Sequence, residues 1–332
     1  MKYEEIISSL KKKEFQPIYL LMGEEGYFID KIADFISHHV LNESEKDFNQ
    51  HILYGKDTTP ETIISYARRF PMMAEHQVII IREAQNIKKL EDLIPYAEHP
   101  LESTILVICH KYKTVDKRKT FVRLVKEKGV VFESQKIYEN QLPDWINHYL
   151  RVHDYSIETQ ASILLSQYLG TDLSKVSNEL DKLIIGYPPK TRITPDHVEK
   201  NIGISKNFNI FELQNAIGER DLLKTNRIIF HFAANQGANP FPKTITGLYF
   251  FFMKLLTYHF MKSKSPGEVA GKLQIHPFFV KSYISAAQKY TIKKIVEIMA
   301  ILREYDMKSK GSGNNSGTTE DLQKEMIYKI LH

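Results

Sequence analysis

The sequence predicts a doubly wound α/β domain followed by a region that is entirely helical. In the first 138 residues, short apolar or β-branched runs alternate with stretches of helical period, which is the pattern of a parallel sheet with crossover helices. Two of these runs, 79–81 and 105–108, show no alternation with polar residues, as expected of parallel strands that are covered on both faces. Around Tyr138 the strands stop, and the period of the apolar residues becomes that of helices.

The α/β domain, residues 1–138, is expected to contain five strands with helices between them. Strands are predicted at 17–22, 49–54, 77–81, 104–109 and 130–133, and helices at 27–40, 60–70, 87–97 and 118–128. The helix at 60–70 has a clear start signal, because threonines precede Pro60 and Glu61 follows it in the first turn.

The helical region is expected to form two further domains, 139–207 and 208–332. Helices of the smaller domain are predicted at 141–153, 157–170 and 172–187, and a last one begins where Thr194 precedes Pro195. In the larger domain, segments with Gly and Pro interrupt the helices. Residues 309–319, rich in Gly, Ser and Asn, are expected to form a flexible loop before a last helix at 320–331.

Length and composition indicate a globular protein of two or three domains. The chain has 332 residues, of which 42% are hydrophobic and 26% charged. The N-terminus lacks a secretion signal pattern, and the most apolar stretch, 246–256, contains Lys254 and is too short for a membrane span, so a cytosolic protein is expected. Cys109 is the single cysteine and lies in an apolar run, so we expect a core side chain, no disulfide and no metal site built from thiolates.

Positive charge is concentrated in the C-terminal third. From residue 215 to the end, 17 Lys and Arg stand against 9 Asp and Glu, whereas the first 214 residues carry a small net negative charge. An anionic polymer, if the protein binds one, would therefore meet the C-terminal part. Lysines on solvated helix faces explain the same numbers equally well, and both interpretations stay open.

The loop after the first predicted strand lies where nucleotide-binding folds have their phosphate loop. A working loop reads Gly-x-x-x-x-Gly-Lys-Ser/Thr, but here Phe28, Ile29 and Asp30 replace the second glycine, the lysine and the hydroxyl. Its glutamates would repel a triphosphate. The segment is therefore either a degenerate phosphate loop or an ordinary strand-turn-helix; it consists of Gly23, Glu24, Glu25, Gly26 and Tyr27.

Five segments lie in order along nearly the whole chain: 18–29, 116–119, 170–173 with 178–183, 276–281 and 302–308. Together they resemble the delta-subunit family of the bacterial DNA polymerase III clamp loader, which belongs to the AAA+ proteins. Each segment alone is a weak signal. The resemblance implies a degenerate AAA+ (RecA-like) domain, a small helical lid domain and a C-terminal helical collar.

The resemblance also implies a function without catalysis, with no cofactor and no metal. Such a subunit binds and opens the ring-shaped sliding clamp so that the clamp can be loaded on primed DNA. The implied partners are the beta clamp, the tau/gamma and delta prime subunits through the collar, and primer-template DNA, but no membrane. The implied location is the cytoplasm, in the replisome at the nucleoid.

Missing catalytic residues agree with this expectation. The strand at 77–81 is followed by a single carboxylate, Glu83, which without a loop lysine cannot organise Mg-ATP. The Ser-Arg-Cys motif of the ATPase sister subunits is also absent, since the matching region, 109–113, reads Cys-His-Lys-Tyr-Lys.

In this family a short apolar wedge before the third strand inserts into a pocket of the clamp. Pro71 is expected to end the helix at 60–70, which would leave Met72 and Met73 on an exposed turn. Family members more often carry Leu-Phe at these two positions, so the shape of the anchor differs here. The alternative is that both methionines pack beneath the sheet. The positions that match the wedge are Phe70, Pro71, Met72, Met73 and Ala74.

The collar is expected to contain a dense aromatic cluster and the DNA contacts. Eight aromatic residues are assigned to its core or to its interface with other subunits: Phe230, Phe232, Tyr249, Phe250, Phe251, Phe252, Tyr258 and Phe260. Five lysines are candidates for contacts to the DNA backbone, with solvated surface as the alternative for each: Lys262, Lys264, Lys272, Lys281 and Lys289.

Two other functions remain open at this point. One is an ATPase of the P-loop type with an unusual loop. The other is a stand-alone helical DNA-binding protein that carries a vestigial α/β domain.

Overall fold

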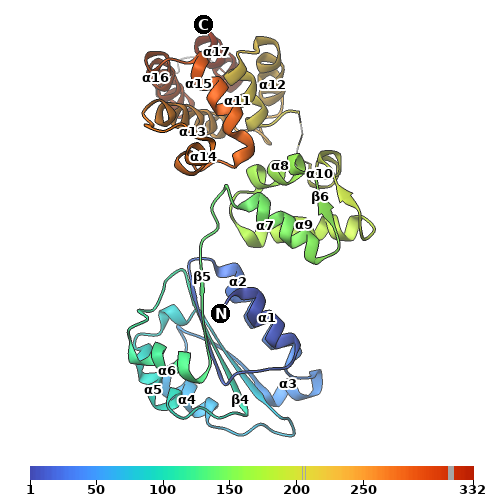
Figure 1. Cartoon of the computed structure of the whole chain (residues 1–332), viewed down its shortest axis with the longest axis vertical. Coiled ribbons are helices and arrows are strands. Elements are labelled where there is room, and N and C mark those ends of the chain that lie inside the picture. Colours follow the sequence, from blue (N-terminus) through green and yellow to red (C-terminus); the bar gives the residue numbers. More distant parts are fainter. Residues whose placement is uncertain (204, 206, 313–317) are drawn as a thin grey trace. The chain divides into compact units, whose positions relative to one another are not determined.

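The chain folds into two compact units, residues Met1–Ile137 and Tyr138–His332. The computed structural model describes residues 1–203, 205, 207–312 and 318–332 (Figure 1). The first unit contains the sheet, and the second is almost entirely helical.

A five-stranded parallel sheet is the centre of the first unit. Its order is β2-β3-β4-β1-β5, so β1 lies between β4 and β5 and β2 is an edge strand. In the register of the sheet, Leu20 of β1 is opposite Ile108 on one side and Val131 on the other. The strands are β1 (Ile18–Gly23), β2 (Gln50–Tyr54), β3 (Gln77–Arg82), β4 (Thr104–Lys111) and β5 (Val130–Ser134).

Helices cover both faces of this sheet. One hydrophobic cluster joins the sheet to α1 and α2 through residues such as Ile29 and Ile36, and a second joins the opposite face to α4 and α6 through Ile63 and Phe121. This two-sided burial explains why the central strands contain no polar alternation. The helices are α1 (Tyr3–Lys11), α2 (Gly26–His39), α3 (Glu43–Asn49), α4 (Pro60–Ala67), α5 (Ile94–Ala97) and α6 (Thr120–Lys128).

The second unit begins with four helices and a very short sheet. Two-residue strands β6 (Ser156–Ile157) and β7 (Arg192–Ile193) pair in parallel. The start of the fourth helix is as predicted, because the Thr194 hydroxyl accepts from the His197 N–H and Pro195 is the first helical residue. The helices are α7 (Leu142–Val152), α8 (Thr159–Leu169), α9 (Leu173–Gly186) and α10 (Pro195–Ile202).

Seven further helices pack around one hydrophobic core in the rest of the second unit. Phe252, Leu255 and Leu302 are fully buried in this core. The division of the second unit at residue 207 into a lid and a collar stays a prediction. The helices are α11 (Ile210–Glu219), α12 (Leu222–Ala234), α13 (Phe241–His259), α14 (Pro266–Leu273), α15 (Val280–Lys289), α16 (Ile292–Ser309) and α17 (Thr319–Leu331), with a 3₁₀ turn η3 (Pro277–Phe279) before α15.

The predicted fold class is confirmed, but several elements differ from the sequence expectation. Strands do not stop at Tyr138, because β6 and β7 follow. The helix expected at 87–97 is instead a 3₁₀ turn, η2 (Leu90–Leu93), followed by the single turn α5, and another 3₁₀ turn, η1 (Ala84–Asn86), precedes this range. Helices α1 and α3 were not predicted. Residues 313–317 of the predicted flexible loop lie outside the described residues.

Over the ranges that the structure describes, no helix is long and apolar enough to cross a membrane.

Candidate functional site

The turn between α4 and β3 exposes a group of large apolar side chains. Met73 is 98% exposed, Phe70 79% and Met72 59%. This exposure excludes the alternative that both methionines pack beneath the sheet. We call residues 70–74 the apolar turn. Its last residue, Ala74, is partly buried and packs against the cluster below α1 and α2, so the chain returns to the core at this point.

Gln77 anchors the helix that leads into the apolar turn. Its side chain is 2% exposed, and its amide nitrogen donates to the backbone carbonyls of Ala67 at 3.4 Å and of Arg69. Thr104 of β4 also donates to the Ala67 carbonyl, at 3.0 Å. These donors satisfy carbonyls that a helix end leaves without a partner. Helix α4 therefore ends at Ala67, and the prediction that Pro71 ends it was wrong.

Asn49 anchors the other end of the apolar turn. This side chain is 2% exposed and makes two hydrogen bonds with the backbone of Met72: its amide nitrogen donates to the Met72 carbonyl at 2.9 Å, and its oxygen accepts from the Met72 N–H at 2.6 Å. A third bond, to the Glu45 carbonyl at 3.0 Å, holds the amide in place. The backbone of Met72 is fixed while its side chain stays in solvent.

Met73 has a left-handed backbone conformation, with φ at +53°. For a residue with a side chain this region costs roughly 1–2 kcal/mol. The flanking anchors at Met72 and Gln77 hold the chain in this geometry, and Met73 is almost completely exposed. The turn thus presents unbranched, polarizable side chains on a backbone that is held from both sides.

The fold explains why the first residue of the degenerate phosphate loop is a glycine. Gly23 has φ at +130°, and a Cβ placed there would lie 2.2 Å from the Ser134 carbonyl oxygen of β5. Contact with the neighbouring strand therefore requires glycine here, whether or not an anion binds.

A carboxylate of the protein lies at the start of α2, where a phosphate would bind in a working loop. Glu25 caps the helix by accepting from the Tyr27 N–H at 3.0 Å. Glu24 is exposed beside it, and a Cβ placed on Gly26 would lie 3.6 Å from the side chains of Lys111 and Tyr112. The helix start is thus complemented by negative charge from within the chain.

Asp30, at the position of the catalytic hydroxyl, belongs to an ion-pair network at the carboxyl ends of β3 and β4. Its carboxylate is 3.0 Å from an Arg82 nitrogen and 2.6 Å from the Lys111 nitrogen, and Arg82 also contacts Asp34 at 2.6 Å. Ile29, at the position of the lysine, is fully buried. The network ties α2 to the sheet through side chains of the protein alone.

The other acidic and thiol groups of this region have structural partners. Glu83 has a left-handed backbone conformation, and its carboxylate accepts from the Asn86 amide at 3.2 Å. Burial raises the pKa of the Cys109 thiol to about 12, which confirms its expected core position and keeps it protonated at neutral pH. Within the described ranges, no group of three or more His, Cys, Asp or Glu has the geometry to hold a metal ion.

The five candidate DNA-contacting lysines are all exposed, but they differ in their contacts. Lys289 forms an ion pair with Glu219 and also donates to its backbone carbonyl at 3.2 Å. The Lys264 nitrogen lies 4.8 Å from the centre of the Tyr258 ring. Four of the five make no ion pair among the described residues: Lys262, Lys264, Lys272 and Lys281.

The aromatic residues of the predicted collar divide into core and surface. Four of them are buried in the helical core: Phe232, Phe251, Phe252 and Tyr258. Four others are exposed: Phe230 at 58%, Tyr249 at 40%, Phe250 at 58% and Phe260 at 70%. Core and interface were both expected for this group, and the exposed half is the part that could contact another protein.

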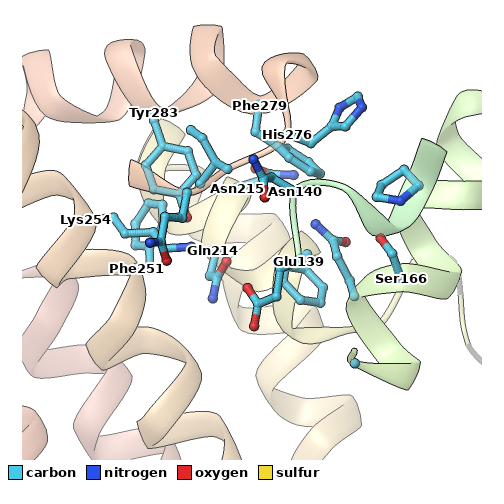
Figure 2. Close-up of a pocket in the computed structure, with 16 residues that line it drawn as sticks. Glu139, Asn140, Ser166, Gln214, Asn215, Phe251, Lys254, His276, Phe279 and Tyr283 are labelled. Carbon is cyan, nitrogen blue, oxygen red and sulfur yellow. The ribbon is translucent and has the colours of Figure 1, made fainter. Parts of the chain in front are cut away.

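A polar pocket in the second unit was not anticipated from the sequence. Figure 2 shows it between α7 and α8 on one side and α11, α13 and α15 on the other; its volume is about 110 Å³. Burial lowers the pKa of Lys254, an effect that nearby Glu139 partly offsets, and burial raises the pKa of Tyr283. Sequence reasoning missed this pocket because its lining comes from segments between residues 139 and 283.

The fold and the site together define a degenerate AAA+ module: a parallel sheet covered on both faces, a phosphate-loop position without lysine or hydroxyl, and an exposed apolar turn. Two family models match the chain, "DNA polymerase III, delta subunit" over residues 19–135 and "DNA polymerase III delta subunit, C-terminal domain" over residues 207–322. The chain therefore belongs to the family of delta subunits of the DNA polymerase III clamp loader.

Individual relatives agree with this assignment. The chain is 25% identical over 323 residues to the DNA polymerase III subunit delta of Bacillus subtilis, which covers 92% of this chain and 91% of the relative. The solved structure of the Bacillus subtilis DNA clamp loader delta protein superposes with a TM-score of 0.66 at 22% identity and covers 99% of both chains. The structural likeness at this identity shows a shared fold.

The two anchors of the apolar turn, Asn49 and Gln77, were missed as site residues. Both were assigned to the first position of a strand. The signal that could have revealed them is a long polar amide at the start of an otherwise apolar run, because such a residue needs buried hydrogen-bond partners.

Replacing Asn49 by Ala is expected to lower the free energy of unfolding by about 1–3 kcal/mol, because the Met72 backbone groups lose their buried partner. Urea denaturation measures the loss, and amide hydrogen exchange at Met72 should become faster. Asn86→Ala, which removes an exposed amide, is the matched control and should change stability by less than about 0.5 kcal/mol. Equal stability of the wild type and Asn49→Ala would contradict the anchoring role.

Proposed function

We propose that this chain binds the sliding clamp through the apolar turn and opens it for loading onto primed DNA, without hydrolysing ATP itself. The observation that carries the proposal is the exposure of Phe70, Met72 and Met73 on a turn whose backbone is anchored by Asn49 and Gln77. Apolar side chains that stay in solvent do not stabilise an isolated monomer, whereas an apolar pocket on a partner would bury all three of them.

Binding free energy is sufficient to open a ring. Moving a two-state clamp from about 1% to about 99% open requires about 5.5 kcal/mol of preference for the open form. Burial of one Met or Phe side chain contributes roughly 1.5–3 kcal/mol. Three such side chains therefore reach the required magnitude, provided that the open clamp buries them more completely than the closed clamp does.

Energy for the loading cycle is proposed to come from neighbouring subunits. The loop from Gly23 to Tyr27 offers a carboxylate where a phosphate would bind, and Asp30 is paired with Arg82 and Lys111. Without a lysine and a hydroxyl, Mg-ATP has no ligands to organise it. Tau/gamma subunits with working loops would then control when the apolar turn is accessible.

The C-terminal helices are proposed to form the collar that joins this chain to the tau/gamma and delta prime subunits. Support comes from four aromatic side chains that lie exposed on α12, on α13 and just after α13: Phe230, Tyr249, Phe250 and Phe260. The exposed lysines of the same region would meet the phosphates of primer-template DNA in the assembled complex. This proposal places the chain in the cytoplasm, with the replisome at the nucleoid.

Replacing Met72 and Met73 together by Ala is expected to abolish binding to the host's sliding clamp, because most of the exposed apolar anchor is removed. Titration calorimetry or co-elution measures the binding. Since both side chains are exposed, the thermal midpoint should not change. Met307→Ala, at an exposed methionine of the other unit, is the control and should bind like the wild type. Unchanged affinity of the double variant would contradict the proposal that the apolar turn binds the clamp.

The isolated chain is expected to show no saturable ATP hydrolysis and no rise in thermal midpoint with Mg-ATP. A ligand at 100 times its Kd would stabilise the fold by about 2.7 kcal/mol, so a thermal shift assay detects even weak binding. Saturable hydrolysis that disappears in Glu83→Gln would instead support the alternative of an ATPase with an unusual loop.

Charge reversal of Lys262, Lys264, Lys272 and Lys281 to Glu is expected to weaken binding of the assembled clamp loader to primed DNA. The slope of log K against log salt should become shallower by about 0.9 for each phosphate that the protein no longer neutralises. Lys289→Glu is the comparison, and a smaller effect is expected because Glu219 already pairs with this lysine. An unchanged slope would argue against DNA binding by these lysines, and tight DNA binding by the isolated chain would favour a stand-alone DNA-binding protein.

A further inference from the structure

Exposed large apolar side chains of the first unit are concentrated in two segments. The apolar turn contributes Phe70, Met72 and Met73. A second group lies at the end of α3 and along β2, where Phe48 is 63% exposed, Ile52 45% and Tyr54 52%. We call Phe48, Ile52 and Tyr54 the apolar strip. Elsewhere in this unit, all of whose residues the structure describes, only Met1 and Tyr112 are large apolar residues with comparable exposure.

Asn49 connects the apolar strip to the apolar turn. Its side chain holds the backbone of Met72 by hydrogen bonds of 2.9 and 2.6 Å, and its chain neighbour is Phe48. Strand β2 starts at the next residue, Gln50, so Ile52 and Tyr54 continue the exposed apolar surface along the edge of the sheet. Two segments whose joined residues are 23 positions apart in the sequence are thus held side by side by these hydrogen bonds.

The uncovered face of β2 is unusual for an edge strand. Ile52 is opposite Ile80 of β3, and Ile80 is fully buried in the cluster that includes α1 and α2. At the start of β2, Gln50 still donates to the Ser37 hydroxyl of α2 at 2.8 Å, whereas Ile52 and Tyr54 further along this face are exposed. Edge strands are usually protected by lysine, proline or a bulge, but residues 50–54 contain no lysine and no proline. A partner that covers this face would protect the strand from unwanted association with other chains.

The opposite face of β2 is already occupied. Leu53 is partly buried and packs against the cluster that includes α4, and the His51 ring lies 4.6 Å from the Tyr66 ring of α4. Only one face of the strand, the one with Ile52 and Tyr54, is open to a partner.

The usual area of a protein interface indicates that a partner bound at the apolar turn also covers the apolar strip. A specific protein interface buries about 800 Å² on each partner. A large aromatic side chain buries only about 150–250 Å², so Phe70, Met72 and Met73 alone supply less than this area. A protein bound at the turn must extend over adjoining surface, and Phe48 and β2 adjoin the turn through Asn49.

We propose that the sliding clamp covers the apolar strip as well as the apolar turn, so that β2 is part of the clamp-binding surface. This inference rests on the proposed function, since it concerns the same partner. The turn supplies the anchor, and the strip supplies the area that excludes water around it and fixes the direction from which the clamp docks.

The test compares clamp affinities of full-length variants. Ile52→Lys with Tyr54→Lys is expected to weaken binding at least about tenfold, with Met72 and Met73 intact. Ile185→Lys changes an 85% exposed residue of the other unit and should bind like the wild type. Met72→Ala with Met73→Ala is measured beside them. If that variant loses binding while the strip variant keeps it, the strip inference is wrong and the proposed function stands. If neither variant loses binding, both fail.

Hydrogen exchange on the wild-type chain gives a readout that does not depend on whether a variant folds. Addition of the clamp should slow amide exchange in residues 48–54 as well as in 70–74. Slowing confined to 70–74 would overturn the inference. So would concentration-dependent self-association of the wild type that the strip variant removes while clamp affinity is unchanged, because the strip would then contact a second copy of this chain.

Discussion

Two buried side-chain amides determine how this protein presents its apolar turn. The Asn49 side chain makes the hydrogen bonds to the Met72 backbone that a neighbouring strand would otherwise make. The Gln77 side chain donates to a backbone carbonyl at the end of α4. The hydrogen bonds from Asn49 to Met72 use only the backbone atoms of Met72. Because the backbone is held by groups inside the fold, the apolar side chains can stay in solvent without collapsing onto the sheet, and the entropy of ordering the turn is lost during folding rather than during binding.

The same domain fills the region of the phosphate-loop position with contacts between its own side chains. In a working module, phosphate and metal bridge the loop, the first helix and the strand ends. Here Asp30 and Asp34 meet Arg82 and Lys111 at those strand ends, and Glu25 caps the helix. These ion pairs are partly exposed, so each contributes modestly to stability. Their effect is geometric: they join α2 to the ends of β3 and β4.

Much of this was predictable from local sequence. Unbroken apolar runs predicted the buried strands, and the pair Thr194-Pro195 predicted the start of α10, because both signals arise within a few residues. The exposed turn was also predicted, although for the wrong reason, since Gln77 and Thr104 rather than Pro71 end α4. Local sequence could not reveal relations across long separations: the pairing of Asn49 with Met72, and the exposure of Ile52 on one face of the edge strand β2.

Cys109 has a practical consequence. The only thiol of the chain lies fully buried in β4, and its raised pKa leaves almost no thiolate at neutral pH. Alkylating reagents therefore have no accessible native target in the folded protein. A cysteine introduced at any exposed position becomes the single point of attachment for a dye, a spin label or a cross-linker. The wild-type sequence thus already behaves as the cysteine-free background that distance measurements on a clamp loader usually require.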